Sequence, residues 1–403
     1  MPRFLTRTIW ILSLVSLFAD LASEMLHPVM PLFLAGIGMN AAGIGFLEGA
    51  AALLAGFGKA WFGSLSDQLQ RRNLFIRLGY GLSAFAKPVM GLFPALWPVF
   101  TARLADRIGK GMRGGARDAV LAGEAAPENR GKVFGFHRSM DTFGALLGAG
   151  FAWLWLYHRP GEYAALFLVA FLPGLLSIGL TLFLPREGKR PPQARKIPYQ
   201  GIFPFWKTAP SPYKLLLVGG LAFAFLNSSD LLLLLRAGDA GRSPTSVLEL
   251  YLLYNLVYAL ASFPLGGLAD RIGFKPVYLG AVLLHGICYF WIGTADAPWA
   301  HWFIFALYGC FAAANEGIVT AWLTHFIPRD RKATGLGLYA FFETFAKFVA
   351  SPLLGLLWVW TDSASAFQAI GIAAAVLALG LAVLLPARKA PATEGDRESP
   401  ILG

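Results

Sequence analysis

Long apolar stretches follow one another along the whole chain, and each is long enough to cross a lipid bilayer as a helix. Because 56% of the 403 residues are hydrophobic and only 14% are charged, the composition is typical of proteins that cross the membrane many times. The 33 Phe and 12 Trp suit a large lipid-facing surface with anchors at the interfaces. The sequence therefore predicts an all-α membrane protein.

The charge and the cysteines favour no other class. The net charge of +11 does not indicate a nucleic-acid partner, because the basic residues lie in short loops between apolar segments. Cys288 and Cys310 both lie inside apolar segments, so we expect no disulfide framework. The sequence has no phosphate-cradling loop, metal-ligand spacing or nucleophile motif, and we expect no enzyme activity, no metal and no cofactor.

Twelve membrane spans are predicted, six in each half of the chain. The first six are Thr8–Ala35, Gly43–Ser66, Leu74–Trp97, Pro98–Gly123, Phe134–Tyr157 and Ala164–Pro185. The second six are Tyr213–Ala237, Ser246–Ala269, Pro276–Thr294, Ala300–Ile327, Leu336–Trp360 and Phe367–Pro386. This division gives an N-terminal bundle (1–185), a Pro-rich basic linker (186–212), a C-terminal bundle (213–387) and a tail (388–403).

The loops predict the orientation of the chain. Lys and Arg gather in one set of loops, from Arg71 to Lys332, whereas the loops on the other side offer only Arg159 and Arg242. The basic side, which carries both termini, is therefore expected to face the cytoplasm. Arg3 and Arg7 precede an apolar run as in a signal peptide, but the run is long enough to span, so we predict an uncleaved first helix. We expect the chain to lie in the inner membrane of a prokaryote.

The segment Pro98–Glu124 is predicted to cross the membrane although it carries many charges. If it were a loop, every later segment would invert and the basic linker would face outward, which the charge bias excludes. At about 2.5–3.5 kcal/mol per charge in mid-bilayer, five cations facing lipid would cost over ~10 kcal/mol. On a helical wheel at about 100° per residue, the charged side chains fall within an arc of roughly 140°. They are Arg103, Asp106, Arg107, Lys110, Arg113, Arg117 and Asp118. This face must therefore look onto protein or a water-filled cavity, as a transporter requires.

The two halves of the sequence repeat each other. Gly63 and Asp67 end the second span as Gly266 and Asp270 end the eighth, and the stretches 134–143 and 336–345 are also alike. With Arg71 and Arg72 after the first pair and Arg271 after the second, these motifs resemble the signature of the major facilitator superfamily over nearly the whole chain. The resemblance implies two pseudo-symmetric six-helix bundles, a binding site between them and transport by alternating access.

The same resemblance implies a gate on the cytoplasmic side. In that family the acid at the position of Asp67 contacts the start of the eleventh helix, here near Gly335–Gly337, and Arg71 would pair with an acid such as Asp118. An alternative is that the arginines only form a solvated, positive-inside loop. We assign to the gate Gly63, Asp67, Arg71, Arg113, Arg117, Asp118, Arg138, Asp141, Gly266, Asp270, Arg271 and Glu343.

The centre of the charged span has two interpretations. It forms either a binding surface for an anionic or partly anionic solute, or a network of ion pairs in which Asp141 lies near Arg113 or Arg117, and Asp20 or Glu24 near Arg107 or Lys110. Glu343 and Lys347, one turn apart, are expected to form an ion pair. We assign to the cavity Arg103, Arg107, Lys110, Lys87, Asn227 and Glu316.

Proton coupling is assigned to acids inside the spans. Asp20 and Glu24 lie one turn apart near the middle of the first span, and two carboxylates about 6 Å apart in a low dielectric seldom both ionise. Asp230 takes a similar place in the second half. The alternative is that cations of the fourth span neutralise both Asp20 and Glu24.

These observations predict a proton-coupled secondary transporter for a small organic solute that is anionic or zwitterionic, with export favoured. One alternative is a proton-coupled importer of a siderophore or an organic acid, and another is a membrane receptor or scaffold that transports nothing. The expected partners are the solute, protons and the lipid bilayer, and we expect a monomer.

Overall fold

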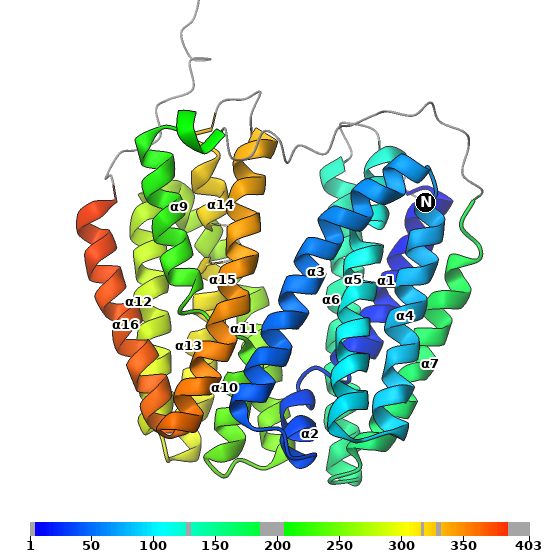
Figure 1. Ribbon diagram of the computed structural model, residues 1–403, viewed down its shortest axis with the longest axis horizontal. Coiled ribbons are helices and arrows are strands. Elements are labelled where there is room, and N and C mark those ends of the chain that lie inside the picture. Colours follow the sequence, from blue (N-terminus) through cyan, green and yellow to red (C-terminus); the bar gives the residue numbers. More distant parts are fainter. Residues whose placement is uncertain (1–4, 126–129, 186–204, 316–317, 328–331, 386–403) are drawn as a thin grey trace, which may run out of the picture.

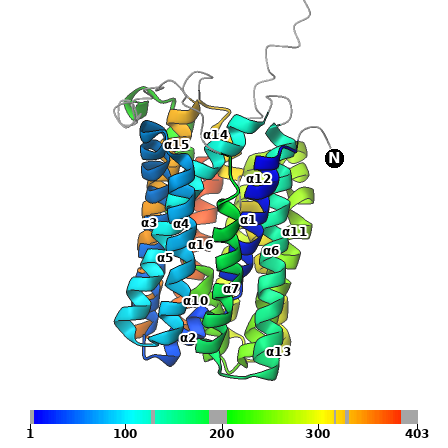
Figure 2. The same cartoon turned by 90° about the vertical axis from the view of Figure 1, so that its right-hand side faces the viewer.

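The computed structural model describes residues 5–125, 130–185, 205–315, 318–327 and 332–385, and these residues form helices and no strand. The first half contains α1 (Arg7–Glu24), α2 (Met30–Gly36), α3 (Ala41–Leu69), α4 (Arg72–Leu92), α5 (Leu96–Glu124), α6 (Arg130–His158) and α7 (Tyr163–Thr181). The second half contains α9 (Ser211–Ala224), α10 (Asp230–Asp239), α11 (Pro244–Ile272), α12 (Phe274–Thr294), α13 (Pro298–Asn315), α14 (Ile318–Leu323), α15 (Lys332–Trp360) and α16 (Ser363–Leu384). Figure 1 shows these helices as two upright bundles side by side, and in Figure 2, turned by 90°, the first bundle lies in front.

The predicted all-α fold of two six-span halves is confirmed. Each predicted span coincides with one long helix or with two consecutive shorter ones. By length and composition alone, 7 of the described helices could cross a membrane. The helix α5 is not among them because it carries too many charges. The bounds of the two bundles stay predictions, and the tail (388–403) lies outside the described residues.

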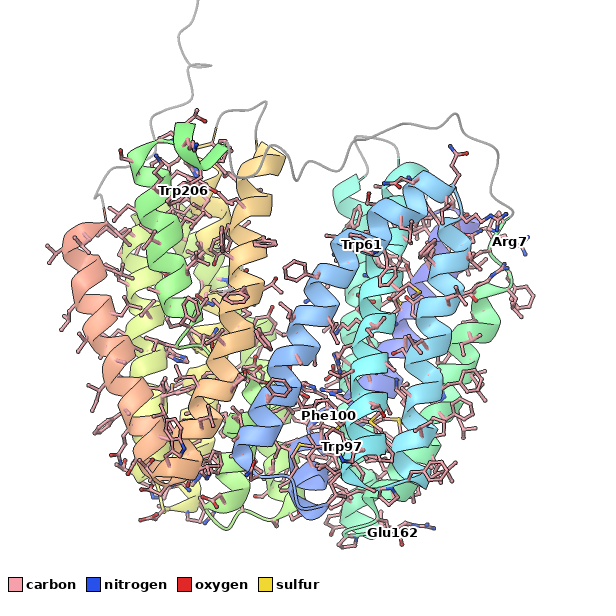
Figure 3. The ribbon with its side chains drawn as sticks, viewed as in Figure 1. Arg7, Trp61, Trp97, Phe100, Glu162 and Trp206 are labelled. Atoms are coloured by element: carbon pink, nitrogen blue, oxygen red, sulfur yellow. The ribbon has the colours of Figure 1, made fainter. Side chains whose placement is uncertain are left out.

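Side chains on the outside of the bundles suit a membrane. Many large apolar side chains are exposed along the helices, and Trp97 and Trp360 are 71% and 73% exposed. In Figure 3, Trp206 lies near the end of the molecule that carries Arg7, whereas Trp97 lies near the end that carries Glu162. Tryptophans near both ends are typical of interfacial anchors.

The first and seventh spans are not continuous helices, so the prediction of single helices there was wrong. The first span breaks at Met25–Val29, between α1 and α2, and the seventh breaks at Phe225–Ser229, between α9 and α10. In the first break, Pro28 has no backbone N–H to donate and its ring crowds the preceding turn. In the second, Ser229 caps α10, since its hydroxyl accepts from the backbone N–H of Leu231. Such irregular backbone is tolerated in a membrane protein where it lines a cavity.

Glycines bring the charged helix α5 between α3 and α4. A Cβ atom at Gly115 would collide with the carbonyl oxygen of Lys59 on α3, and one at Gly109 with the carbonyl of Gly79 on α4. Close approach of this kind is a common use of glycine between membrane helices. Because α5 is enclosed by its neighbours, Arg103 and Asp106 are at most 5% exposed. The expectation that the charged face looks onto protein or a cavity is confirmed.

The two halves touch each other at the end away from the N-terminus. A Cβ atom at Gly45 or Gly49 of α3 would collide with backbone carbonyl oxygens of α15, and the rings of Phe57 and Phe341 lie 5.0 Å apart. A Cβ at Gly238 of α10 would also meet the side chain of Leu32 on α2. Toward the N-terminal end, α3 and α15 diverge in Figure 1.

Candidate functional site

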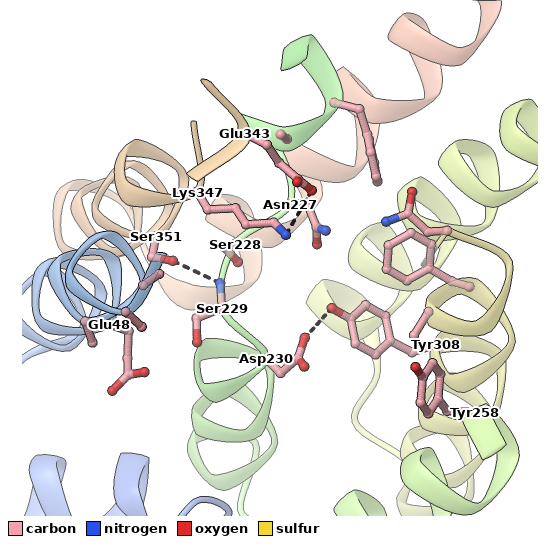
Figure 4. Close-up of a pocket in the computed structure, with 18 of the residues that line it drawn as sticks. Glu48, Asn227, Ser228, Ser229, Asp230, Tyr258, Tyr308, Glu343, Lys347 and Ser351 are labelled. Carbon is pink, nitrogen blue, oxygen red and sulfur yellow. Dashed lines mark hydrogen bonds and ion pairs between the residues drawn. The ribbon is translucent and has the colours of Figure 1, made fainter. Parts of the chain in front are cut away.

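A cavity of about 710 Å³ lies between the two halves. Its volume is within the range that is usual for small-molecule sites. The first half contributes residues of α3 and α5 and His27 from the first helix break, and the second half contributes the break before α10 together with α11, α13 and α15. Figure 4 shows part of this lining. Both helix breaks therefore reach the cavity.

The first-half wall of the cavity is cationic. Arg107 and Lys110 of α5 both line it, as the sequence predicted for their position. Arg107 lies 3.2 Å from Asp106 through one terminal nitrogen, and its buried Nε has no hydrogen-bond partner among the described residues. Lys110 is exposed and has no ion pair within 4.0 Å in the described part of the chain. Their role in binding a solute stays a prediction.

Arg103 does not line the cavity, although the sequence analysis assigned it there. Its Nε and Nη2 donate to the two carboxylate oxygens of Glu48 on α3, at 2.9 and 3.1 Å. Both side chains are buried, and Arg103 also lies 3.8 Å from Asp106. Glu48 also lines the cavity and was not among the predicted site residues. Its signal was a lone acid in the apolar first half of the second span.

Lys87 is also away from the main cavity. Its ammonium donates to the carbonyl oxygen of Ser83 at 3.0 Å and lies 3.7 Å from Asp106. The Ser83 hydroxyl donates to the same Asp106 carboxylate. Lys87 thus helps to neutralise Asp106 inside the first bundle, because a buried carboxylate needs such partners.

The second-half wall carries acids and aromatic side chains. Asp230 lines the cavity and accepts hydrogen bonds from Tyr308 at 2.7 Å and from Tyr254 at 3.3 Å. Glu343 and Lys347 also line it and form the expected ion pair, at 3.0 Å. Glu343, which the sequence analysis assigned to the cytoplasmic gate, is therefore a cavity residue in this conformation.

The remaining predicted cavity residues have different outcomes. Asn227 lines the cavity from the break before α10. Glu316 lies outside the described residues, so its assignment stays a prediction. The tyrosines of α11 and α13 were not predicted, because an aromatic side chain in an apolar span has the same appearance in the sequence whether it faces lipid or a cavity.

Asp20 and Glu24 lie outside the cavity lining. Glu24 accepts a hydrogen bond of 2.6 Å from the hydroxyl of Tyr251, which belongs to the other half. Asp20 is surrounded by charges of both signs, and the groups that act on it are Asp141, Arg113, Lys110 and Glu24. Neither acid forms an ion pair within 4.0 Å with Arg107 or Lys110. Their part in proton coupling stays a prediction.

Two predicted ion pairs of the gate are wrong in this conformation. Asp118 pairs with Lys59 at 2.7 Å and with Arg117 at 3.1 Å, not with Arg71. The reason is the close approach of α3 and α5, since Lys59 extends over Gly114 and reaches Asp118 one turn further along.

Asp141 also has an unexpected partner. Its carboxylate lies 3.7 Å from a ring nitrogen of His137 on its own helix, a contact that is an ion pair only when this ring is protonated, and it forms no ion pair within 4.0 Å with Arg113 or Arg117. Arg113 instead lies over the ring of Tyr80, 4.3 Å from its centre. Arg117 donates to the hydroxyl of Ser16 at 2.7 Å and is also paired with its neighbour on α5. These arginines therefore join α5 to α1 and α4.

The other gate residues are only partly described. Gly63 packs against Gly115 of α5, whereas Arg71, Arg138, Gly266 and Arg271 are exposed. The side chains of Asp67 and Asp270 lie outside the described part of the structure. The contact of Asp67 with the start of the eleventh span therefore stays a prediction.

Comparison with known proteins agrees with this architecture. The family model of the Major Facilitator Superfamily matches residues 12–237 and 215–401. An uncharacterised MFS-type transporter of Methanocaldococcus jannaschii is 30% identical over 363 residues, which cover 88% of this chain and 89% of that protein. An uncharacterised protein of Mycobacterium bovis is 30% identical over 185 residues, or 46% of this chain and 45% of that protein.

Solved structures show the same fold at low identity. A mutant of the nucleoside transporter NupG superposes with a TM-score of 0.80 at 12% identity, covering 94% of this chain and 100% of that one. A D-xylose–proton symporter superposes with a TM-score of 0.71 at 16% identity, covering 94% and 97%. The family match along the chain, the relative in M. jannaschii and the two-bundle fold lead to one conclusion. The chain belongs to the major facilitator superfamily and is a secondary transporter of that type.

Proposed function

We propose that this transporter moves a small organic solute that carries a carboxylate or phosphate, and that it couples this movement to protons. The observation that carries the proposal is the cationic wall of the cavity, formed by Arg107 and Lys110. Arg107 keeps a buried donor without a partner among the described residues, and a guanidinium suits a carboxylate or phosphate because it can donate two parallel hydrogen bonds.

The conformation supports alternating access. With the termini in the cytoplasm of a prokaryotic cell, as the basic loops indicate, the contacts between α3 and α15 close the outer side of the inner membrane. The cavity then belongs to an inward-open state. A rocking motion of one bundle against the other would open the outer side. Because one chain contains both bundles, a monomer is sufficient for this motion.

The anionic solute leads to a test on Arg107. Arg107→Lys should weaken binding of anionic ligands about tenfold or more, because lysine keeps the charge but loses the paired donors. Binding to the purified protein in detergent is measured for monocarboxylates, dicarboxylates and organic phosphates, with lipophilic cations as the opposite panel. Arg159→Lys is the matched control, since Arg159 is exposed, forms an ion pair with Glu162 in a loop and lies outside the cavity lining. Preferential binding of the cations, insensitive to Arg107→Lys, would overturn the anionic assignment.

Proton coupling leads to a test on Asp20 and Glu24. If one of them carries the coupled proton, its amide variant should keep solute exchange between the two sides but lose accumulation driven by a pH gradient. Vesicles that contain the purified protein report both activities, and gradients of opposite direction distinguish export from import. Gradient-driven transport at the native level in both Asp20→Asn and Glu24→Gln would move the coupling to another acid.

A further inference from the structure

Asp230 lies on the wall of the cavity and has no counter-ion among the described residues. It begins α10, and in the part of the chain that the structure describes no Lys, Arg or His nitrogen lies within 4.0 Å of its carboxylate. Lys347, which acts on it over a longer range, is held by Glu343 at 3.0 Å. Figure 4 shows Asp230 turned toward Tyr308 and away from that ion pair. Asp230 is half-buried, and a carboxylate partly withdrawn from water without a cation is costly, so this position favours a positively charged guest.

The hydrogen bonds of Asp230 leave room for such a guest. Tyr308 donates to Oδ1 at 2.7 Å and Tyr254 donates to Oδ2 at 3.3 Å. A carboxylate oxygen has two lone pairs, so each oxygen can accept one more hydrogen bond. The two hydroxyl groups hold the carboxylate in place, and its free lone pairs can accept from an ammonium group.

Aromatic rings surround this carboxylate. The ring of Tyr254 lies 5.4 Å from that of Tyr308 and 6.4 Å from that of Tyr258, and all three line the cavity together with Phe311. The face of an aromatic ring attracts an organic cation within about 6 Å of its centre. An acid beside several aromatic faces therefore fits an ammonium group better than it fits a hydrated metal ion.

We propose that Asp230, Tyr254 and Tyr308 form a subsite for an ammonium group, and that the transported solute is a zwitterion with separated charges. Its anionic end would lie against Arg107 and Lys110 on the opposite wall, and for that end the inference rests on the proposed function. A solute with both charges satisfies both walls of the cavity, whereas a simple anion leaves Asp230 without a cation.

A proton and an ammonium group exclude each other at Asp230. The protonated carboxyl has no charge to attract the ammonium, so amine binding should weaken as the pH falls. When the ammonium binds to a protonated site, the carboxyl proton is released to water in the cavity. Among the described residues, other charged or titratable groups face the subsite from its own half and from across the cavity. On its own half they are Tyr254 and Tyr258 of α11, Tyr289 of α12, Tyr308 of α13, and Tyr339, Glu343 and Lys347 of α15. Across the cavity they are His27, Glu48, Arg107 and Lys110.

The test uses three matched probes: para-(aminomethyl)benzoate, para-methylbenzoate and para-methylbenzylamine. Binding to the purified full chain in detergent is measured by titration calorimetry at several pH values. The native protein should bind the zwitterion most tightly. Asp230→Asn should lower the affinity for the zwitterion and for the amine at least about tenfold and remove the pH dependence of amine binding. Its affinity for para-methylbenzoate should stay within about twofold of the native value.

Two further variants control for folding and for charge. Asp230→Glu keeps the carboxylate, so it should retain amine binding that Asp230→Asn loses. Asp296→Asn removes the same charge from an exposed loop and should change no probe. Amine and zwitterion binding that is equal in Asp230→Asn and native protein would overturn the subsite, as would failure of the native protein to bind either. If instead the proposed anion site at Arg107 is wrong, para-methylbenzoate binding will be insensitive to Arg107→Lys, whatever the effect of Asp230→Asn.

Discussion

Replacing Arg103 by methionine is expected to destabilise the protein by about 3–5 kcal/mol, because Glu48 would remain buried without its cation. Arg103 is 3% exposed and donates two hydrogen bonds to Glu48, which is itself only 8% exposed. The substitution also removes one of the cations near Asp106. A single change would therefore leave a charge inside a membrane bundle with no described partner of opposite sign.

The double variant Arg103→Met with Glu48→Met separates the ion pair from its packing. Replacing both partners of a buried pair by apolar groups is often nearly neutral, so the double variant should recover most of the lost stability. Thermal unfolding in detergent measures the stability of the two single variants and of the double variant relative to the native protein. Arg159→Met, which removes an exposed ion pair, serves as the control. If the double variant is as unstable as the sum of the two single variants, Glu48 and Arg103 do not stabilise each other.

The fold could be predicted from the sequence because the bilayer leaves few options. Long apolar runs specify the spans, basic loops specify their orientation, and the cost of a charge in lipid requires the charged segment to be enclosed. Enclosure of the charged segment could be predicted without knowing its neighbouring helices, and the burial of Arg103 and Asp106 confirms it. The breaks at Pro28 and Ser229 were missed, because each span is long enough to cross as one helix in spite of the polar residues at the break, Glu24 and His27 in the first span and 227–230 in the seventh.

The partners of the charged residues could not be predicted. Whether Asp118 meets Lys59 or Arg71 depends on how closely and at what rotation α3 packs on α5, which the glycine contacts decide. The same holds for the pairing of Arg103 with Glu48, 55 residues away. Composition identifies which side chains must be neutralised, whereas helix packing decides which of them remain at the cavity wall.

A substitution at Gly45 should act on the conformation of the transporter and not on its fold. In this structure a Cβ atom at Gly45 would collide with the carbonyl oxygen of Ser351, so Gly45→Ala penalises the contact between α3 and α15. Overpacking of a tight contact costs about 1–3 kcal/mol, which corresponds to a change of about fivefold to 150-fold in an equilibrium. The outward-open state separates these helices, so Gly45→Ala is expected to shift the population toward it.

Electron–electron resonance distances between spin labels at the ends of α3 and α15 nearest the N-terminus would measure this shift, because those ends approach each other when the cavity closes there. Gly81→Ala is the neutral control, since nothing lies within 4 Å of its Cβ position. Gly115→Ala is the structural control, because its Cβ would collide with Lys59 inside the first bundle and should lower stability in both states. Distances that are the same in Gly45→Ala and the native protein would show that the contact at Ser351 does not hold the outer side closed. A shorter distance in Gly45→Ala alone would show that the close approach of Gly45 to Ser351 stabilises the state in which the cavity faces the cytoplasm.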